Sequence, residues 1–449
     1  MGHAELNVQA QAAQVQGLAM KNHWMPFTPN RDFHANPQMA VKAEGMYFWD
    51  TAGNKIIDAS SGLFCVAAGH ARREIADAVH AQMMQLDYIP PFLRGQAKSF
   101  ELANRIAGLT PGKLNSIFFC NSGSESVDTA MKMCLAYHRV RGEAQRQMFI
   151  SRERAYHGVG FGGVSLSGLV NNRRAFGLGL NGVAHMRHTH IPQNKFERGE
   201  GSHGVELAED LQRLINLYGA ENIAGVFIEP VAGSTGCLVP PKGYLKRVRE
   251  ICDANNLLLI FDEVITGIGR MGNWFAAESF DVTPDILTMA KAITNGVQPM
   301  GVVAAREDIH DAINESQKNP NAPEFFHGYT YSAHPVPVAA ALATLDIYES
   351  ENLLQKARDL SPYFLDAIWS LRDLPIVTDI RGFGSMAAFD VAMDGAPGNR
   401  GHVLQKRLYE NGLHLKTTGD AAILAPPFIA EKSHIDEIAD KLRRVLKMF

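Results

Sequence analysis

Short apolar runs alternate with amphipathic segments through the middle of the chain, and this alternation restricts the fold more than any other feature. The runs at 148–150, 225–228, 257–261 and 286–289 are almost entirely apolar, as expected of strands that are buried on both faces. An amphipathic stretch over 244–255 leads into the third of them. This order is typical of βα units, whose strands pair in parallel. The sequence therefore predicts an α/β domain built around a parallel sheet.

The pattern changes near residue 332. Two long helical stretches follow, over 335–350 and 353–371, and two strand-like runs come after them at 376–380 and 386–391. Because helices and strands no longer alternate one by one, this part is expected to form a separate, smaller α+β lobe.

A hairpin is expected near the amino terminus, where the runs 46–49 and 55–58 flank a turn at 50–54. We expect this segment to pack with the carboxy-terminal lobe. The predicted division is an amino-terminal segment at 1–70, a large domain at 71–332 and a small domain at 333–449.

Composition and charge exclude several classes of protein. Of the 449 residues, 46% are hydrophobic and 20% are charged, which is ordinary for a packed protein. The formal net charge of −4 leaves no basic field to attract nucleic acid. No apolar run approaches the roughly 18 residues of a membrane span. A small molecule is therefore the expected partner, rather than nucleic acid or a membrane.

Cysteine and histidine spacing indicates neither a disulfide framework nor a metal site. The five cysteines are odd in number and form no C-x-x-C pair, which favours a reducing, cytoplasmic environment. His185, His188 and His190 fit no metal-binding spacing, and we expect them at a surface or an interface. No metal is expected.

A segment rich in serine and glycine, from Asn121 to Ser126, separates a predicted strand at 117–120 from a predicted helix at 125–141. The free backbone N–H groups and the dipole at a helix start favour a phosphate, and serine hydroxyls add donors. The same residue types also form ordinary helix caps. This segment alone leaves both interpretations open.

Two apolar runs end in a charged residue, namely Asp262 and Lys291. Ligands bind at the carboxyl ends of strands in open parallel sheets. A carboxylate there can hold a pyridine nitrogen protonated, and a buried lysine with a lowered pKa can attack an aldehyde. The alternative for Asp262 is a magnesium site, but the chain has no G-x-x-x-x-G-K-[ST] loop. The alternative for Lys291 is a solvated strand end; its place one βα unit after Asp262 favours the lysine nucleophile.

Six motifs in the same order make the sequence similar to class III aminotransferases that depend on pyridoxal 5′-phosphate (PLP), over nearly its whole length. They are Asn121-Ser-Gly-Ser-Glu125, Ala155-Tyr-His-Gly158, Ile228-Glu-Pro230, the run from Phe261 to Arg270, Pro284-Asp285 with Ala290-Lys291, and His327-Gly-Tyr-Thr-Tyr-Ser332. Two more segments, His23-Trp-Met-Pro-Phe-Thr28 and Lys242-Gly-Tyr-Leu245, resemble the ω-amino acid:pyruvate (β-alanine:pyruvate) branch most.

This resemblance implies the aspartate-aminotransferase-like fold of PLP-dependent transferases (fold type I), with a mostly parallel seven-stranded sheet and a smaller α+β domain. It implies that Lys291 binds the cofactor as a Schiff base and that Asp262 pairs with the pyridinium nitrogen. Thr330 is expected to reach the phosphate of a neighbouring subunit in a homodimer or tetramer. The other cofactor-binding residues that it implies are Ser122, Gly123 and Ser124 at the phosphate, Tyr156 and Val264 on the ring faces, and His157 and Glu229 nearby.

The reaction that the resemblance implies is that of an ω-transaminase. Such an enzyme moves an amino group from an ω-amino acid or primary amine to pyruvate by a ping-pong mechanism, giving an aldehyde or ketone and alanine. Diaminopelargonate synthase and the 4-aminobutyrate and diamine aminotransferases share most of these motifs and remain alternatives. A non-catalytic relative is disfavoured because Lys291 and Asp262 are both present.

Substrate-binding residues are expected to include Trp24, Phe64 and Phe92, which stand where aromatic residues line the pocket in this branch. Packing in the core is the alternative for each of them. Many relatives also carry an arginine that grips the oxo acid carboxylate, and the corresponding position here holds Lys416. A lysine offers a point charge without the planar fork of arginine. Arg94 is the alternative group for the carboxylate.

Overall fold

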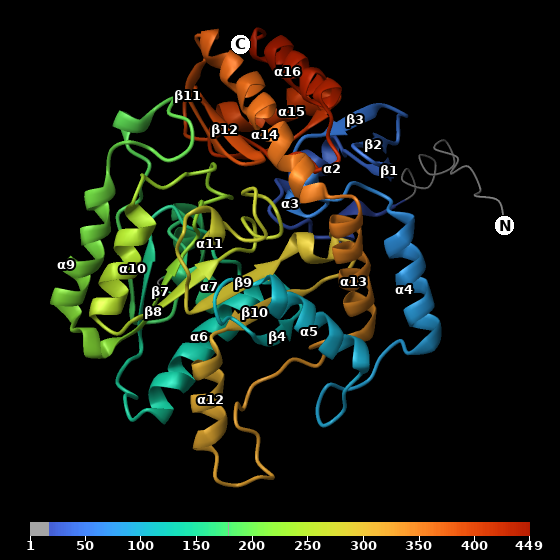
Figure 1. The fold of residues 1–449 in the computed structure, drawn as a ribbon. Coiled ribbons are helices and arrows are strands. Elements are labelled where there is room, and N and C mark those ends of the chain that lie inside the picture. Colours follow the sequence, from blue (N-terminus) through green and yellow to red (C-terminus); the bar gives the residue numbers. More distant parts are fainter. Residues whose placement is uncertain (1–17, 178) are drawn as a thin grey trace.

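A computed structural model of the protein describes residues 18–177 and 179–449. Its centre is a seven-stranded sheet made of β4 (Ser116–Cys120), β5 (Met148–Arg152), β6 (Val183–Met186), β7 (Ile223–Ile228), β8 (Leu258–Asp262), β9 (Ile286–Ala290) and β10 (Gly301–Ala305). The strand order is β4-β10-β9-β8-β7-β5-β6 (Figure 1). Strands β6, β5, β7, β8 and β9 each pair in parallel with the next one in this order. Strand β10 runs antiparallel to both β9 and β4. The predicted sheet, mostly parallel and seven-stranded, is confirmed.

Two of these strands, β6 and β10, lie outside the predicted runs. Strand β10 is apolar and wholly buried but only five residues long, and so short a run cannot be told from a buried helix segment by periodicity. Strand β6 lies at the edge of the sheet and is buried only at alternate residues. Its sequence therefore shows a weaker apolar pattern than that of a strand buried on both faces.

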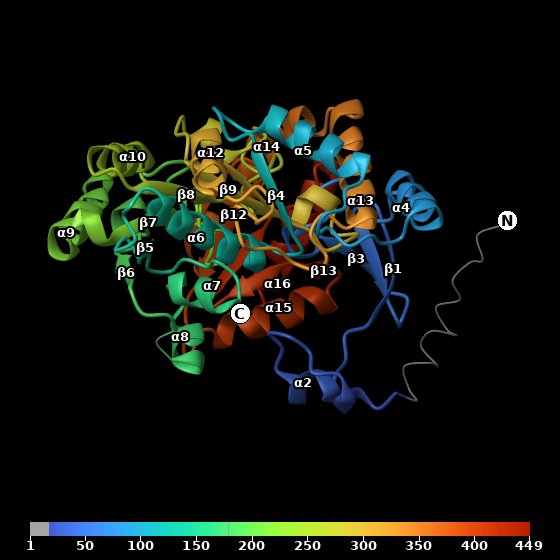
Figure 2. The same cartoon turned by 90° about the horizontal axis from the view of Figure 1, so that it is seen from below.

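Helices cover both faces of this sheet (Figures 1 and 2). The longer helices on this sheet are α4 (Arg73–Gln85), α5 (Ala97–Leu109), α6 (Gly123–Val140), α9 (Glu209–Tyr218), α10 (Tyr244–Ala254), α12 (Glu307–Ser316) and α13 (Pro335–Ser350), and those of the small domain are α14 (Leu353–Trp369), α15 (Asn399–Glu410) and α16 (Lys432–Leu446). The shorter ones are α2 (Asn30–Ala35), α3 (Ser61–Phe64), α7 (Phe161–Leu166), α8 (Val170–Phe176) and α11 (Ala276–Ser279). Along β8, Leu258 and Ile260 join the core beneath α6 and α12. Leu259 and Phe261 point the other way, into the core formed with α9, α10 and α13.

The small domain contains a second sheet in the order β11-β12-β15-β14. Its strands are β11 (Val377–Phe383), β12 (Met386–Val391), β14 (Lys416–Thr418) and β15 (Ala421–Leu424). Helices α14, α15 and α16 pack with it around a core that includes Phe364, Phe389 and Leu442. Figure 1 shows this domain in orange and red beside the large sheet.

The amino-terminal segment forms a third sheet together with a strand from the other end of the chain. Strands β1 (Ala40–Glu44), β2 (Tyr47–Asp50) and β3 (Lys55–Asp58) pair antiparallel, and β3 pairs in parallel with β13 (Leu413–His414). Ile57 lies opposite Leu413, and both are buried in the core of the small domain. These contacts support the predicted packing of the amino-terminal segment with the carboxy-terminal lobe.

Helix α13 packs with the large domain, although it belongs to the segment predicted for the small one. Val338, Ala341 and Leu345 join the core of the large sheet, and the helix contacts α4 and α5. Apolar residues occur on nearly all sides of this helix. Its sequence therefore does not indicate which domain it packs against. The boundary between residues 332 and 333 stays a prediction, and these contacts favour one after Ser350.

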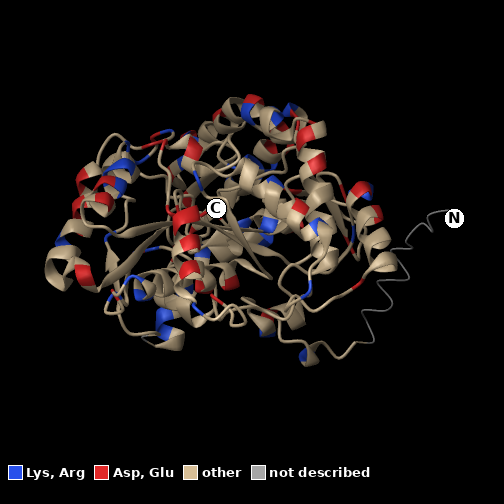
Figure 3. Ribbon diagram, turned by 60° about the horizontal axis from the view of Figure 1, so that its bottom comes forward, with Lys and Arg blue, Asp and Glu red and all other residues tan. Residues whose placement is uncertain are grey.

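Acidic and basic residues are interspersed along the outer helices (Figure 3). Arg247 of α10, for example, lies 2.6 Å from Glu209 of α9 and 3.1 Å from Glu250 of its own helix. Exposed pairs of this kind contribute little to stability, because water and salt screen them. Among the described residues, no helix is both long enough and apolar enough to cross a membrane.

Candidate active site

A cavity of about 330 Å³ lies at the carboxyl ends of β7, β8 and β9, where ligands bind in open α/β sheets. The start of α6 and the loop after β5 complete its wall. Nine of the predicted cofactor-binding residues line it: Ser122, Gly123, Ser124, Tyr156, His157, Glu229, Asp262, Val264 and Lys291. Segments far apart in the sequence therefore meet in one place.

One end of the cavity is the first turn of α6, which offers hydrogen-bond donors. Ser122 caps the helix, and its Oγ accepts a hydrogen bond from Glu125 N at 3.2 Å. Ser124 Oγ accepts one from Val159 N at 3.0 Å. A hydroxyl that accepts through a lone pair can still donate its proton. Both serines can therefore support the protein and bind an anion, so the cap and phosphate interpretations are compatible.

Glycine is required at position 123 because the start of α6 lies very close to Val264. A Cβ at this position would lie 2.8 Å from Cγ1 of Val264, closer than two carbon atoms can pack. A side chain at 123 would push Val264 and the helix start apart, whereas glycine leaves a cradle in which backbone N–H groups face the cavity.

Asp262 is a buried carboxylate held in one orientation. Its Oδ2 lies 2.8 Å from His157 Nδ1, and its Oδ1 accepts hydrogen bonds from Val264 N and Thr288 Oγ1, both at 3.2 Å. His157 Nε2 in turn lies 3.2 Å from Ser151 Oγ. A buried carboxylate is costly unless it is paired or hydrogen-bonded. These contacts fix Asp262 at the cavity wall, ready to pair with a ligand cation.

Glu229 holds the loop that carries Tyr156. Its Oε1 accepts a hydrogen bond from Tyr156 N at 2.9 Å, and its Oε2 accepts one from Gly233 N at 3.1 Å. Burial raises the pKa of Glu229 above the ordinary value, and the nearby charge of His157 opposes this shift. Because the carboxylate bonds main-chain N–H groups, it fixes the backbone of Tyr156 and leaves the phenol ring free to face a ligand.

Lys291 directly follows β9 and begins a 3₁₀ turn, Lys291–Thr294. Its φ of 52° lies in the left-handed region, which costs a residue with a side chain about 1–3 kcal/mol. Burial lowers the pKa of its amine, while Cys65, Asp262 and Glu229 act in the opposite direction. A lowered pKa increases the fraction of neutral amine, which is the form that attacks an aldehyde.

Lys416 does not line the cavity. Its main-chain N donates a hydrogen bond to Ser60 Oγ at 3.2 Å, in the turn that leads to Cys65 at the cavity wall. Burial lowers the pKa of Lys416, and the charge of Lys291 lowers it further. A lysine of the small domain is thus attached to the segment that carries Cys65.

The residues around the cavity fit PLP. The hydroxyls of Ser122 and Ser124 and the start of α6 suit a phosphate, the fixed carboxylate of Asp262 suits a pyridinium nitrogen, and the amine of Lys291 suits an aldehyde. The cradle left by Gly123 gives the room that the phosphate needs.

Besides Lys416 and Phe64, four of the predicted residues lie outside this cavity, and all four are exposed. Trp24 is 88% exposed and Phe92 59% exposed. Arg94 is also exposed, and its Nη1 donates to the main-chain oxygen of Leu93 at 2.8 Å. Thr330 is exposed on the loop before α13, where its main-chain oxygen accepts a hydrogen bond from Tyr88 at 3.0 Å. Their predicted roles all require a second subunit or a different conformation.

Phe64 is buried rather than directed into the cavity. It is 2% exposed and packs in a core between the domains with Ile265 and Met386. Its φ of 63° belongs to the left-handed region. We expected a pocket residue at this position, and the structure gives Phe64 a packing role, since the turn at α3 directs the ring into the core.

Several residues at the site were not predicted, and three of them illustrate why. Thr288 and Ser151 orient Asp262 and His157, and Cys65 lines the cavity. Thr288 had a signal in the sequence, because it is a polar residue inside an otherwise apolar strand. Ser151 and Cys65 had none, since small polar residues at strand ends and turns are common.

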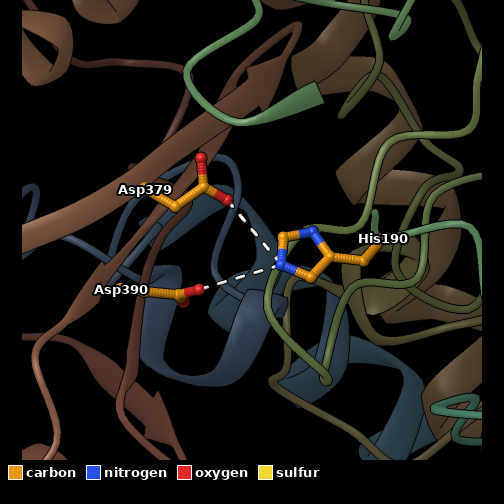
Figure 4. Close-up of side chains that lie close together, drawn as sticks. All are labelled: His190, Asp379 and Asp390. Carbon is orange, nitrogen blue, oxygen red and sulfur yellow. Dashed lines mark ion pairs between the residues drawn. The ribbon is translucent and has the colours of Figure 1, made fainter. Parts of the chain in front are cut away.

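A second cluster of ionisable groups lies between the domains, away from the cavity (Figure 4). His190 Nε2 lies 3.7 Å from Asp379 Oδ2 and 3.9 Å from Asp390 Oδ2, an arrangement that could hold a metal ion. Arg381 already pairs with both carboxylates, at 2.9 and 2.8 Å. Burial lowers the pKa of His190 to about 4, and the charges of Arg381 and Arg154 contribute to this shift. A cation here would have to compete with guanidinium groups, so the cluster is better suited to joining the domains.

Comparisons with known proteins agree with this site. The family model described as Aminotransferase class-III matches residues 29–446. An Omega-aminotransferase of Caulobacter vibrioides is 50% identical over 425 residues, which cover 94% of this chain and 96% of that protein. A Beta-alanine–pyruvate aminotransferase of Pseudomonas aeruginosa is 46% identical over 431 residues, 96% of each chain.

Solved structures give the same result. An omega transaminase from Pseudomonas jessenii, solved in complex with PMP, has a TM-score of 0.91 and 30% identity and matches over 96% of both chains. An (S)-enantioselective omega-transaminase from Thermomicrobium roseum has a TM-score of 0.90 and 32% identity. The predicted family, fold type and cofactor are thus confirmed: the chain belongs to the class-III aminotransferases, which use PLP.

Proposed function

We propose that this enzyme transfers an amino group from an ω-amino acid or a primary amine to pyruvate, giving an aldehyde or ketone and alanine. The relatives named Beta-alanine–pyruvate and Omega-amino acid–pyruvate aminotransferase, at 46% and 45% identity, support this choice. The observation that carries it is the place of Lys416, a partly buried lysine whose main-chain N bonds Ser60 Oγ at 3.2 Å in the turn that leads to Cys65 of the cavity. It can pair with the carboxylate of an oxo acid whose carbonyl carbon lies near Lys291.

The chemistry divides between the cofactor and the chain. When bound, PLP supplies an aldehyde and a protonated ring that withdraws electrons from the carbon bearing the substrate amine. Lys291 would hold the aldehyde group of the cofactor. When free, its amine would take the proton from the substrate carbon and return it in the reverse half-reaction, since its lowered pKa makes the neutral form accessible.

The other residues hold the reacting groups in place. Asp262 keeps the ring nitrogen charged, and its contacts with His157 and Thr288 prevent it from turning away. Tyr156 and Val264 line the same cavity and would restrict the ring of the cofactor, which limits how the substrate can turn relative to Lys291. In the second half of the cycle the same groups act in reverse on pyruvate.

A donor panel tests the proposal. The purified enzyme with PLP and pyruvate is offered β-alanine, 4-aminobutyrate, putrescine and 1-phenylethylamine, and alanine is measured. Alanine formation from β-alanine or 1-phenylethylamine supports the proposed function. Alanine from putrescine alone would indicate a diamine aminotransferase, and no alanine from any donor would contradict pyruvate as the acceptor.

Lys416→Ala is expected to raise the KM for pyruvate by about tenfold, because a charge-assisted hydrogen bond is lost. The KM for an uncharged amine donor should change by less than about twofold. Steady-state kinetics with both substrates measure this difference. Arg94→Ala is the matched comparison: if it raises the pyruvate KM and Lys416→Ala does not, the carboxylate belongs to Arg94.

The proposed enzyme is a cytoplasmic homodimer, or a tetramer built from such dimers, with active sites at the subunit interface. Exposed apolar side chains around Thr330 favour a subunit interface at this place, since a large exposed apolar patch usually marks an interface. Phe326 is 92% exposed, Leu93 94% and Tyr331 58%. A second copy could cover them and bring Thr330 to the phosphate of its neighbour.

Thr330→Ala is expected to weaken PLP binding by about three- to tenfold, the effect of one lost hydrogen bond to a phosphate. Cofactor release followed by absorbance measures this, and sedimentation equilibrium gives the oligomeric state. Thr330→Ser keeps the hydroxyl and should bind PLP normally. A monomeric enzyme, or unchanged affinity in Thr330→Ala, would contradict the shared site.

A further inference from the structure

The loop at 229–238, after β7, connects the cofactor side of the site to the small domain. It has no regular structure, yet nearly all of it is buried. Glu229 fixes its start by accepting hydrogen bonds from Tyr156 N and Gly233 N at 2.9 and 3.1 Å. The position of this loop is thus set by the same carboxylate that sets the backbone of Tyr156.

Two side chains of the small domain bind this loop. Thr418 Oγ1 donates a hydrogen bond to the main-chain oxygen of Ser234 at 2.7 Å. Arg381 Nε donates to the main-chain oxygen of Gly236 at 2.6 Å, and Arg381 itself is 5% exposed. The loop therefore serves as the point where the small domain is fixed against the active site.

Thr418 ends β14, the strand that begins at Lys416. This strand has three residues and lies at the edge of its sheet, where it pairs only with β15. Alternate residues of a strand share a face, so Lys416 and Thr418 point to one side. Thr417 points to the other, where its Oγ1 donates to Gln405 at 2.7 Å. At the start of the strand, Lys416 N donates to Ser60 Oγ at 3.2 Å.

We infer that Thr418 is a positioning residue for Lys416: by bonding Ser234 it holds the hairpin of β14 and β15 against the loop at 229–238, so that the Lys416 side chain, on the same face of the strand, keeps the position from which it can bind a substrate carboxylate. The inference rests on the proposed role of Lys416. It links that amine to Tyr156 through Ser234 and Glu229, so the carboxylate site and the cofactor platform share one support. Pairing with β15 and the turn at Gly419 and Asp420 hold the hairpin together, and the Thr418 hydroxyl adds the contact that fixes it against the loop.

Equilibrium binding of propionate to the holoenzyme tests this inference. Propionate has a carboxylate but neither an amine nor a carbonyl group, so its dissociation constant can be measured without turnover. Thr418→Val is expected to raise that constant by about three- to tenfold, the effect of one lost hydrogen bond. Thr418→Ser, which keeps the hydroxyl, should restore it to within about twofold. Thr417→Val makes the same chemical change on the opposite face of the strand and should leave propionate binding unchanged.

A double variant separates positioning from general damage. In a Lys416→Met background, Thr418→Val should have no further effect on propionate binding. An equal loss in both backgrounds, or an equal loss in Thr417→Val, would overturn the positioning role. A different result would contradict the proposed function, namely a wild-type enzyme that forms no alanine from pyruvate. Because propionate binding is measured without turnover, it tests the role of Thr418 separately.

Discussion

Replacing Lys291 with alanine is expected to lower kcat by about 10⁴-fold, because one side chain supplies both the nucleophile and the proton carrier. PLP should still bind, since Ser122, Ser124 and Asp262 are unchanged. Single-turnover and steady-state assays measure the loss. Lys246→Ala, which removes an exposed lysine of α10, is the control and should keep normal turnover.

Borohydride reduction gives a second measurement of the same assignment. The wild-type holoenzyme should be yellow, and reduction followed by peptide mapping should place the cofactor on Lys291. A cofactor adduct on Lys242 or Lys246 would contradict the assignment, as would near-normal turnover in Lys291→Ala.

Asp262→Asn is expected to slow the half-reaction with an amine donor by about 10²- to 10³-fold, the size of effect found when one preorganised electrostatic group is removed. The amide preserves the size of the side chain but removes the negative charge that keeps the ring nitrogen protonated. Rapid mixing of the holoenzyme with donor, followed by absorbance, measures the rate. A rate within about threefold of the wild type would show that Asp262 acts only in packing.

The neighbouring residue provides a matched control for this change. Glu263 is also buried, and it accepts hydrogen bonds from Ala276 N and Ala277 N at 2.6 and 2.9 Å. Burial raises the pKa of Glu263 to about 7. Since these contacts face α11 rather than the cavity, Glu263→Gln should lower the melting temperature and leave the half-reaction rate unchanged. Equal rates in the two variants would show that loss of a buried charge, rather than loss of the ring partner, causes the effect.

The sequence predicted the centre of the fold well because buried parallel strands have a strong local signal. Strand β8 is apolar up to Asp262, and strand β9, which Lys291 follows directly, is apolar except for Thr288. Their order along the chain places the two residues on neighbouring strands, β8 and β9, which pair in parallel. A ligand site at the carboxyl ends of these strands follows from that geometry.

Features that depend on distant contacts were harder to predict. The domain against which α13 packs depends on where an apolar surface is available in the folded protein. The sequence of an apolar helix is compatible with either domain. Phe64 was expected in the pocket because its position resembles that of relatives, but the direction of its ring depends on the left-handed backbone of α3. The support that Thr288 gives Asp262 depends on pairing between two strands, which no single segment reveals.

The parallel pair of β3 and β13 affects how the chain can fold during synthesis. Ile57 leaves the ribosome long before Leu413, its partner in the sheet. At a translation rate of roughly 5–20 residues per second, the interval is on the order of tens of seconds. During that time one edge of the hairpin lacks its final strand and can pair with other nascent chains. A truncated chain that ends before β13 should therefore be prone to aggregation, and a chaperone that covers exposed strand edges should improve the yield of active enzyme.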